Sequence, residues 1–284
     1  MGELLKKIAF QGQLGAYSDL AARAVFPAVA TLPCRVFEDV FAAVTSGQAD
    51  RGLLPVENSV AGRVAEIHQL LPNAGLYIVG EHFQPVSHCL LAPAGASLTT
   101  ITEVHSHPQA LQQSRQFITK QGYRAVAHVD TAGAAAEIAE RNDPTLAAIA
   151  SRLAGEIYGL QILSEKLEDA AHNTTRFLVL STQAETPQFD PHHPESTMTS
   201  FMFRLRNVPA ALYKALGGFA TNGVNLTKLE SYLVDGKFTA AQFYTECQGH
   251  VDSPALKQAL DELAFYTHDI KILGSYPAHS FRRA

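Results

Sequence analysis

The sequence predicts a mixed α/β protein with a two-lobed region over residues 1–182, a linker over 183–197 and a smaller βαββαβ domain over 198–280. In the first region, short apolar runs alternate with alanine-rich helical patterns, which is typical of sheets covered by helices. The linker contains three prolines and no periodicity. The last region has its own order of strand and helix patterns, so it is expected to form a separate domain.

The first region is expected to contain two α/β units. Strands are predicted at 7–10, 35–37, 52–54, 86–91, 124–128, 146–149 and 176–181, and helices at 18–26, 38–46, 64–71, 108–121, 131–141 and 151–158. Ser18 is a suitable N-cap for the first helix, and Gly122 ends the fourth. We expect one lobe from about 1–80 with 155–182, another from about 81–154, and a small-molecule cleft between them.

The last region follows a ferredoxin-like order. Strands are predicted at 199–206, 224–233, 238–247 and 270–275, and helices at about 209–222 and 254–266. Asn207 is expected to cap the first of these helices, with Pro209 in its first turn. Asp235 and Gly236 predict a hairpin turn between the two middle strands.

Composition argues against several classes of protein. The formal net charge is -5 and no basic patch occurs, so nucleic-acid binding is not expected. No apolar stretch is long enough to span a membrane, and the first residues leave no room for the apolar core of a signal peptide, so a cytoplasmic protein is expected. Cys34, Cys89 and Cys247 form neither a disulfide framework nor a metal-binding pair. His192 and His193 have no third ligand nearby and are interpreted as linker.

Four short motifs occur in the first region. They are 12–18 (Gly-Gln-Leu-Gly-Ala-Tyr-Ser), 55–59 (Pro-Val-Glu-Asn-Ser), 106–111 (Ser-His-Pro-Gln-Ala-Leu) and 173–177 (Asn-Thr-Thr-Arg-Phe). In this order and spacing they resemble the prephenate dehydratase family, and the last contains its Thr-Arg-Phe signature. Residues 222–231 (Asn-Gly-Val-Asn-Leu-Thr-Lys-Leu-Glu-Ser) resemble a regulatory ACT domain. The resemblance implies a periplasmic-binding-protein-like catalytic fold that converts prephenate to phenylpyruvate, water and carbon dioxide in phenylalanine biosynthesis, with no metal or cofactor.

The resemblance makes Thr175 the candidate catalytic residue. Prephenate loses a ring hydroxyl, so the enzyme has to stabilise the charge that develops on the leaving oxygen. A threonine hydroxyl is a weak acid, so we interpret Thr175 as a positioned hydrogen-bond donor to that oxygen and not as a full proton donor. The structural alternative is a threonine that satisfies backbone groups where a strand begins.

The family motifs also supply candidate substrate-binding residues: Gln11, Tyr17, Asn58, Ser59, Ser106, His107, Arg176 and Phe177. Arg176 can hold a carboxylate through two parallel hydrogen bonds, or it can form a salt bridge between the lobes. Ser106 and His107 open a predicted helix, whose free N–H groups attract anions. Asn58 and Ser59 can bind a carboxylate or hydroxyl or simply cap the next helix, Tyr17 can belong to the core, and Phe177 is expected to pack the cleft wall.

An ACT resemblance implies that L-phenylalanine binds between paired domains, as expected of a homodimer or homotetramer. The candidate residues are Ala210, Ala211, Leu212, Asn222, Gly223, Asn225, Leu226, Glu230 and Ser231. The chain departs from the family at Ala210, where glycine is usual, and at Tyr232 and Leu233, which replace an arginine and a proline. A methyl group at the helix start and the loss of a charged donor lead us to expect weaker inhibition or altered selectivity.

Two rival functions stay open. Arogenate carries an amino acid side chain in place of the keto acid, and the same motifs serve arogenate dehydratases. A non-catalytic, two-lobed small-molecule sensor shares the expected fold, because fold does not determine function. A fusion to chorismate mutase is not expected in this sequence, since its first predicted element is a strand and not an all-helical segment.

Overall fold

The computed structural model describes residues 5–170, 172–233 and 240–283. The chain divides into two compact units, Met1–Ile67 with His82–Phe177, and His68–Glu81 with Leu178–Ala284. None of the helices in the described ranges is long and apolar enough to cross a membrane. Each unit is described below by itself.

The first sheet has the strand order β2-β1-β3-β11-β5, and β4 pairs with β3. Its strands are β1 (Lys7–Gln11), β2 (Ala30–Cys34), β3 (Arg51–Asn58), β4 (Gly62–Arg63), β5 (Tyr77–Pro85) and β11 (Thr174–Ser181). Strand β1 runs parallel to both β2 and β3, and its residues Ile8, Ala9 and Phe10 are fully buried. The helices of this part are α1 (Tyr17–Val25), α2 (Phe37–Thr45) and α3 (Ala65–Leu70), followed by the 3₁₀ turn η1 (Leu71–Asn73).

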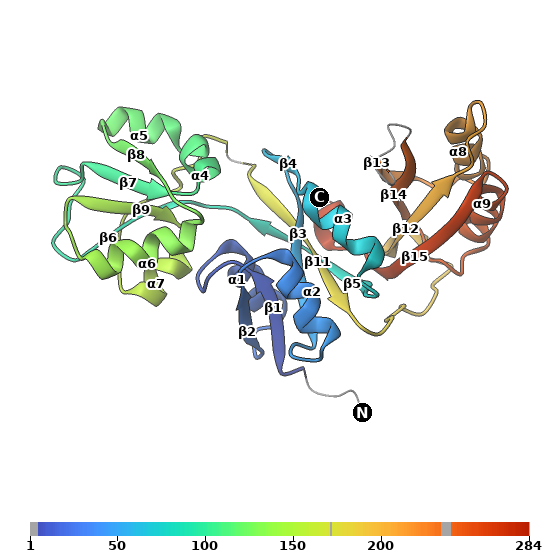
Figure 1. Cartoon of the computed structure of the whole chain (residues 1–284), viewed down its shortest axis with the longest axis horizontal. Helices are drawn as coiled ribbons and strands as arrows, with labels where there is room; N and C mark the ends of the chain where they lie inside the picture. Colours follow the sequence, from blue (N-terminus) through green and yellow to red (C-terminus); the bar gives the residue numbers. More distant parts are fainter. Residues whose placement is uncertain (1–4, 171, 234–239, 284) are drawn as a thin grey trace. The chain divides into compact units, whose positions relative to one another are not determined.

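The second sheet has the order β10-β6-β9-β7-β8 (Figure 1). Its strands are β6 (Cys89–Ala92), β7 (Glu103–Ser106), β8 (Arg124–Ala127), β9 (Leu146–Ala150) and β10 (Gln161–Glu165), and its helices are α4 (Pro108–Gln113), α5 (Arg115–Gln121), α6 (Thr131–Arg141) and α7 (Arg152–Tyr158). All of β9 is buried, as expected of a central strand covered on both faces.

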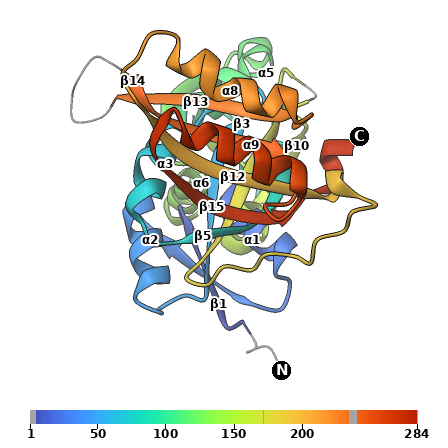
Figure 2. The same ribbon diagram turned by 90° about the vertical axis from the view of Figure 1, so that its right-hand side faces the viewer.

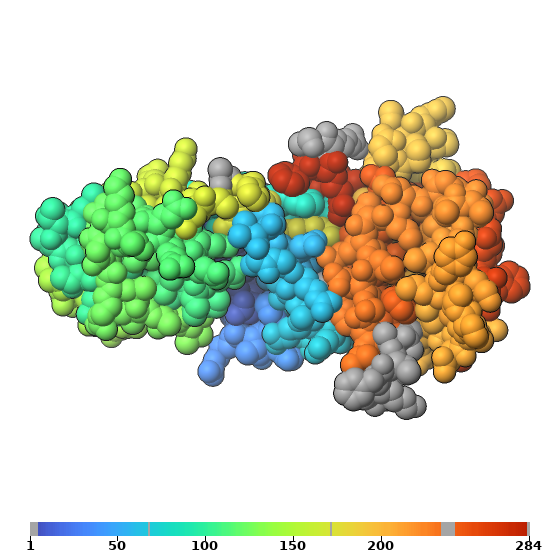
Figure 3. Space-filling view, turned by 90° about the horizontal axis from the view of Figure 1, so that it is seen from above, coloured from blue at the N-terminus to red at the C-terminus, as the bar shows by residue number. Residues whose placement is uncertain are grey.

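Alternation along β6 and β9 gives this lobe two apolar cores, one on each face of the sheet. Leu91 and Ala148 pack with residues of α6, whereas Leu90 and Ile149 pack with Ile118 of α5. Figure 3 shows the lobe as a body of green and yellow-green atoms. The lobe therefore holds itself together through its own cores.

The chain crosses between the two sheets twice, from β5 to β6 and from β10 to β11. The two crossings are hydrogen-bonded to each other: the Val86 N–H donates to the Asn173 carbonyl at 2.9 Å, and the Leu167 N–H donates to the His88 carbonyl at 3.1 Å. Each crossing therefore restrains the other.

The second unit contains a four-stranded sheet in the order β13-β14-β12-β15. Its elements are β12 (Thr197–Leu205), α8 (Ala211–Thr221), β13 (Leu226–Leu233), β14 (Ala240–Gln248), α9 (Pro254–Ala264) and β15 (Thr267–Pro277), with the 3₁₀ turns η2 (Pro194–Ser196) and η3 (Ser280–Arg283). Both helices pack on one face of this sheet (Figure 2) around Phe201, Phe219 and Leu263. The predicted ferredoxin-like order and the two-lobed α/β class are confirmed.

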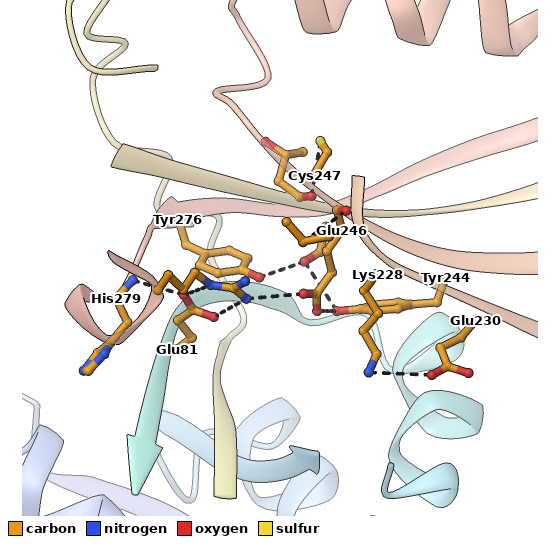
Figure 4. A network of polar contacts seen from close by, with 12 residues as sticks. Glu81, Lys228, Glu230, Tyr244, Glu246, Cys247, Tyr276 and His279 are labelled. Carbon is orange, nitrogen blue, oxygen red and sulfur yellow. Dashed lines mark hydrogen bonds and ion pairs between the residues drawn. The ribbon is translucent and has the colours of Figure 1, made fainter. Parts of the chain in front are cut away.

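A buried polar network in the second unit is shown in Figure 4. The Arg282 guanidinium donates to both carboxylate oxygens of Glu81, from Nε at 2.6 Å and from an Nη at 2.9 Å, and lies 3.5 Å from Glu246. Glu81 also accepts the backbone N–H of His279 at 3.0 Å, and Glu246 accepts the Tyr244 hydroxyl at 2.5 Å. One arginine thus contacts two buried carboxylates.

Several predicted boundaries are wrong. The second sheet includes β10 and the first includes β5, so the second lobe extends from about 89 to 165 and not over 81–154. The strand predicted at 35–37 is β2, Ala30–Cys34, which lies at a sheet edge. The predicted helix at 108–121 is two helices, because the backbone at Ser114 leaves the helical region with φ -113° and ψ 20°.

The predicted helix caps differ as well. Helix α1 has Ala16 at its N-cap and no side-chain cap, so Ser18 lies inside the helix. Helix α8 begins at Ala211 after a left-handed Ala210, and neither Asn207 nor Pro209 belongs to it. The predicted turn at Asp235 and Gly236 lies outside the described residues.

Candidate active site

A cavity of about 240 Å³ in the first unit collects residues from both lobes. This volume lies just below the range typical of drug-sized ligands, so it suits a small metabolite. Five of the predicted site residues line the cavity: Gln11, Tyr17, Asn58, His107 and Thr175. The motifs therefore converge in space, although they lie far apart in the sequence.

The loop before α1 brings the first motif to the cavity. Gly12 and Gly15 have φ values of 119° and 87°, which favour glycine. A Cβ atom at Gly15 would lie 2.8 Å from the Cα of Ala154. The Gly15 carbonyl accepts the Ser151 hydroxyl at 2.5 Å, so the loop is fastened to the second lobe at a point where no side chain fits.

Backbone groups contribute to the electrostatics of the cavity. Ala16, Tyr17 and Ser18 line it at the start of α1, where no side chain caps the helix, and a helix N-terminus attracts anions. No lysine or arginine is among the described residues that line the cavity, and its acidic member, Asp130, caps α6 by accepting the Gly133 N–H at 2.6 Å. Recognition of an anion here depends on neutral donors and the helix end.

Asn58 determines the direction of the hydrogen bond at Thr175. The backbone N–H groups of Val60 and Ala61 donate to Asn58 Oδ1 at 3.0 and 2.8 Å. The amide nitrogen of Asn58 therefore faces the other way, and it donates to Thr175 Oγ1 at 2.9 Å. Because the Thr175 oxygen accepts this bond, its own hydrogen is available to a ligand in the cavity.

Three further polar residues join this arrangement, and none was predicted as a site residue. The Asn173 amide nitrogen donates to Gln113 Oε1 at 3.0 Å, and Asn173 Oδ1 accepts from Asn58 at 2.8 Å. His88 Nε2 lies 3.0 Å from the same Gln113 oxygen, and His88 Nδ1 lies 2.8 Å from the Tyr17 hydroxyl. Each is a polar residue within a pattern that the sequence analysis interpreted in another way. Gln113 lies in a predicted helix, His88 in an apolar run, and Asn173 at the start of a motif.

Burial shifts the pKa values of two of these groups. Desolvation lowers the pKa of His88, which is 2% exposed, and raises the pKa of Tyr17 well above its usual value. Both groups are therefore neutral near pH 7.

The structure separates the two residues of the Ser106–His107 pair. Ser106 is fully buried, and its hydroxyl donates to the Ile149 carbonyl at 2.5 Å, so it neither caps α4 nor lines the cavity. His107 is the N-cap, with Nδ1 accepting the Gln109 N–H at 3.2 Å. Of this pair only His107 lines the cavity, together with Gln109 and Ala110 of the same motif.

Three other predicted residues do not line the cavity. Arg176 is 5% exposed and lies over the Phe83 ring at 5.9 Å from its centre, because successive residues on β11 face opposite sides of the strand. Phe177 is 1% exposed and belongs to the core. The Ser59 hydroxyl donates to the His172 carbonyl at 2.6 Å, which ties two segments together. These residues support the site and do not form its surface.

The candidate effector residues lie at three places in the second unit. Ala210, Ala211 and Leu212 are at the start of α8, Asn222 and Gly223 follow its end, and Asn225, Leu226, Glu230 and Ser231 lie before or on β13. Helix α8 has 11 residues, so its two ends are about 16 Å apart. A single chain does not gather all of these residues around one small ligand.

Comparisons with known proteins agree with this architecture. The prephenate dehydratase family model matches residues 8–185. A bifunctional N-acyl-homoserine lactone acylase/prephenate dehydratase of Komagataeibacter europaeus is 51% identical over 97% of each chain. Arogenate dehydratase/prephenate dehydratase 2 of Arabidopsis thaliana is 38% identical over 95% of this chain and 72% of its own. The prephenate dehydratase of Arthrobacter aurescens, solved in complex with L-Phe, has a TM-score of 0.86 at 28% identity, covering 96% of this chain and 90% of that one.

Proposed function

We propose, since the chain belongs to the prephenate dehydratase family, that it converts prephenate to phenylpyruvate, carbon dioxide and water. The family places it among lyase-type enzymes. The observation that carries the proposal is the Thr175 hydroxyl, which accepts a hydrogen bond from Asn58 and so presents its hydrogen to the cavity.

The reaction breaks two bonds of the prephenate ring. The bond to the ring carboxylate breaks and releases carbon dioxide, and its electron pair completes the aromatic ring as the carbon–oxygen bond to the hydroxyl breaks. The departing hydroxide takes up one proton and becomes water. Thr175 stabilises the charge on this oxygen by donating a hydrogen bond to it, and the accepted bond from Asn58 strengthens that donor.

The test compares Thr175→Ala with Thr175→Ser in a prephenate assay. We expect Thr175→Ala to lower kcat roughly 100-fold or more with little change in KM, because the lost bond is made in the transition state. Thr175→Ser keeps a hydroxyl and is expected to retain most of the activity. If Thr175→Ala is as active as Thr175→Ser, the Thr175 hydroxyl has no role in the reaction.

Arogenate is the alternative substrate for the same chemistry. Asp130 places a carboxylate at the cavity, where it would favour an ammonium group, and the Arabidopsis relative is described as acting on both compounds. We expect prephenate to have the higher kcat/KM. A higher value for arogenate, lost in Asp130→Asn, would reverse the assignment.

A second activity is suggested by the bacterial relative, which is described as an N-acyl-homoserine lactone acylase as well as a prephenate dehydratase. The observation in its favour is 51% identity along nearly the full length of both chains. We propose to incubate the protein with an N-acyl-homoserine lactone and to measure release of the fatty acid and homoserine lactone. No release above a heat-inactivated control would exclude this activity.

We further propose that residues 198–280 form an ACT domain that binds L-phenylalanine across a pair of chains, within a cytoplasmic homodimer or homotetramer. Its ferredoxin-like order and the L-Phe complex of the Arthrobacter relative support this, and three free, buried cysteines suit a reducing compartment. Calorimetric titration with millimolar phenylalanine, at concentrations where the oligomer persists, tests it; a flat titration would refute it. A protein that binds phenylalanine but converts none of these substrates would be a sensor.

A further inference from the structure

A series of side-chain hydrogen bonds runs from Thr175 to the buried His88 in the first unit. Asn58, Asn173, Gln113 and His88 are linked end to end by bonds of 2.8 to 3.0 Å. His88 and Asn173 are only 2% and 3% exposed. Buried polar atoms rarely lack partners, so the direction of each bond can be assigned in turn.

The assignment starts from the backbone. Val60 and Ala61 donate N–H groups, so the Asn58 atom they reach is its oxygen, and the Asn58 nitrogen faces Asn173. The Asn173 atom that meets this nitrogen must be its oxygen, which leaves the Asn173 nitrogen to donate to Gln113. The Gln113 atom at that point is therefore its amide oxygen, which carries no hydrogen.

The same Gln113 oxygen is the partner of His88 Nε2 at 3.0 Å. An amide oxygen can only accept, so Nε2 must carry a hydrogen. His88 Nδ1 is then an acceptor in the neutral ring, which agrees with the lowered pKa of this histidine. The Tyr17 hydroxyl lies 2.8 Å from this nitrogen and 2.8 Å from the Ser87 carbonyl, so these two acceptors share its one hydrogen. Two backbone N–H groups in one lobe thus select the tautomer of a histidine at the other end of the series.

We infer that His88 is a positioning residue, which holds Gln113 with its Nε2–H and thereby keeps Asn173, Asn58 and the Thr175 hydroxyl in the orientation that the reaction needs. The Gln113 oxygen receives one donor from Asn173 and one from His88. Without His88, only one of these bonds restrains the Gln113 amide, which can then rotate and present its nitrogen to Asn173. The effect on the reaction rests on the proposed function, whereas the tautomer does not.

Two substitutions distinguish the roles of the two ring nitrogens of His88. His88→Gln places an amide nitrogen near the position of Nε2 and can still donate to Gln113, whereas His88→Asn reaches only the position of Nδ1. We expect His88→Asn to lower kcat roughly 10- to 100-fold with a smaller change in KM, because the misplaced group acts in the transition state. His88→Gln should recover most of that loss, with both variants checked for matching thermal melting. Equal kcat values for the two variants would overturn the positioning role.

The tautomer is tested independently by long-range proton–nitrogen NMR on the intact protein labelled with ¹⁵N-histidine, with His88→Gln used to assign the signal. We expect a neutral ring protonated at Nε2 at pH 7.5. A ring protonated at Nδ1 would overturn the inference, whatever the activity and even if His88→Asn does not fold. An Nε2–H ring in a protein inactive on prephenate would preserve the hydrogen-bond assignment, remove the kinetic role and count against the proposed function.

Discussion

Arg282 provides a quantitative test of the buried network in the second unit. The Arg282 guanidinium contacts two carboxylates. One belongs to Glu81, whose side chain is fully buried, and the other to Glu246, whose side chain is 2% exposed. Arg282→Met keeps much of the side-chain length and removes the charge. Both carboxylates would then be buried without this partner, and breaking a buried ion pair in this way costs about 3–5 kcal/mol.

The remaining contacts place the expected loss near the lower end of that range. Glu81 keeps the backbone N–H of His279, and Glu246 keeps the Tyr244 hydroxyl. We therefore expect Arg282→Met to lower the free energy of unfolding by about 3 kcal/mol. Urea titrations followed by circular dichroism and tyrosine fluorescence measure it; the chain has no tryptophan.

Two variants control this measurement. Lys257→Met breaks an ion pair with Asp252 in which both side chains are 58% exposed, and it should cost less than about 1 kcal/mol. The double variant Glu81→Gln/Arg282→Met removes a buried charge together with its partner, so it should be more stable than Arg282→Met alone. An Arg282→Met loss no greater than that of Lys257→Met would refute the reasoning.

The other predictions concern one backbone position and one surface carboxylate. Ala210 is exposed and has a φ of 59°, a left-handed conformation that costs a residue other than glycine about 1–2 kcal/mol. Glycine removes this cost but makes the unfolded chain more flexible, which offsets part of the gain. Ala210→Gly should therefore stabilise the protein by about 0.5–1 kcal/mol in the same urea titration. Ala220→Gly, at an exposed position inside α8, should instead destabilise it by up to about 1 kcal/mol, and the same sign for both would contradict this account. Hydrogen bonds from the backbone of Lys6 and Lys7 lower the pKa of Asp50, so its stabilisation is present above the unfolded pKa and is lost as pH falls through the folded pKa. Asp50→Asn should therefore cost about 1 kcal/mol at pH 7 and little near pH 2, and a loss independent of pH would argue against it.

Three of the strands that the sequence did not predict share a position in the fold, whereas β7, also not predicted, lies inside the second sheet between β9 and β8. Ala30–Cys34, Tyr77–Pro85 and Gln161–Glu165 each form an edge of a sheet, as β2, β5 and β10. Edge strands have one side without a neighbouring strand, so they need no continuous apolar run. The central strand β9, buried along its whole length, was predicted within one residue.

The candidate site was predictable where a motif contains the residue that faces the cavity. Thr175 and Asn58 belong to that group. Gln113 and His88 do not, because their partners lie 25 to 71 residues away in the sequence and only the folded chain brings them together. Arg176 belongs to the same motif but lies on the face of β11 opposite Thr175, because successive residues of a strand face opposite sides.

The paired crossings between the two sheets restrict how the two lobes can move. A rotation of one lobe against the other has to bend both connections, since they join the sheets and are bonded to each other. The amide series joins the lobes as well, because Asn58 belongs to the first sheet and Gln113 to α4 of the second lobe. A movement of the lobes therefore acts on this series of hydrogen bonds, and the orientation of the Thr175 donor is coupled to the arrangement of the lobes.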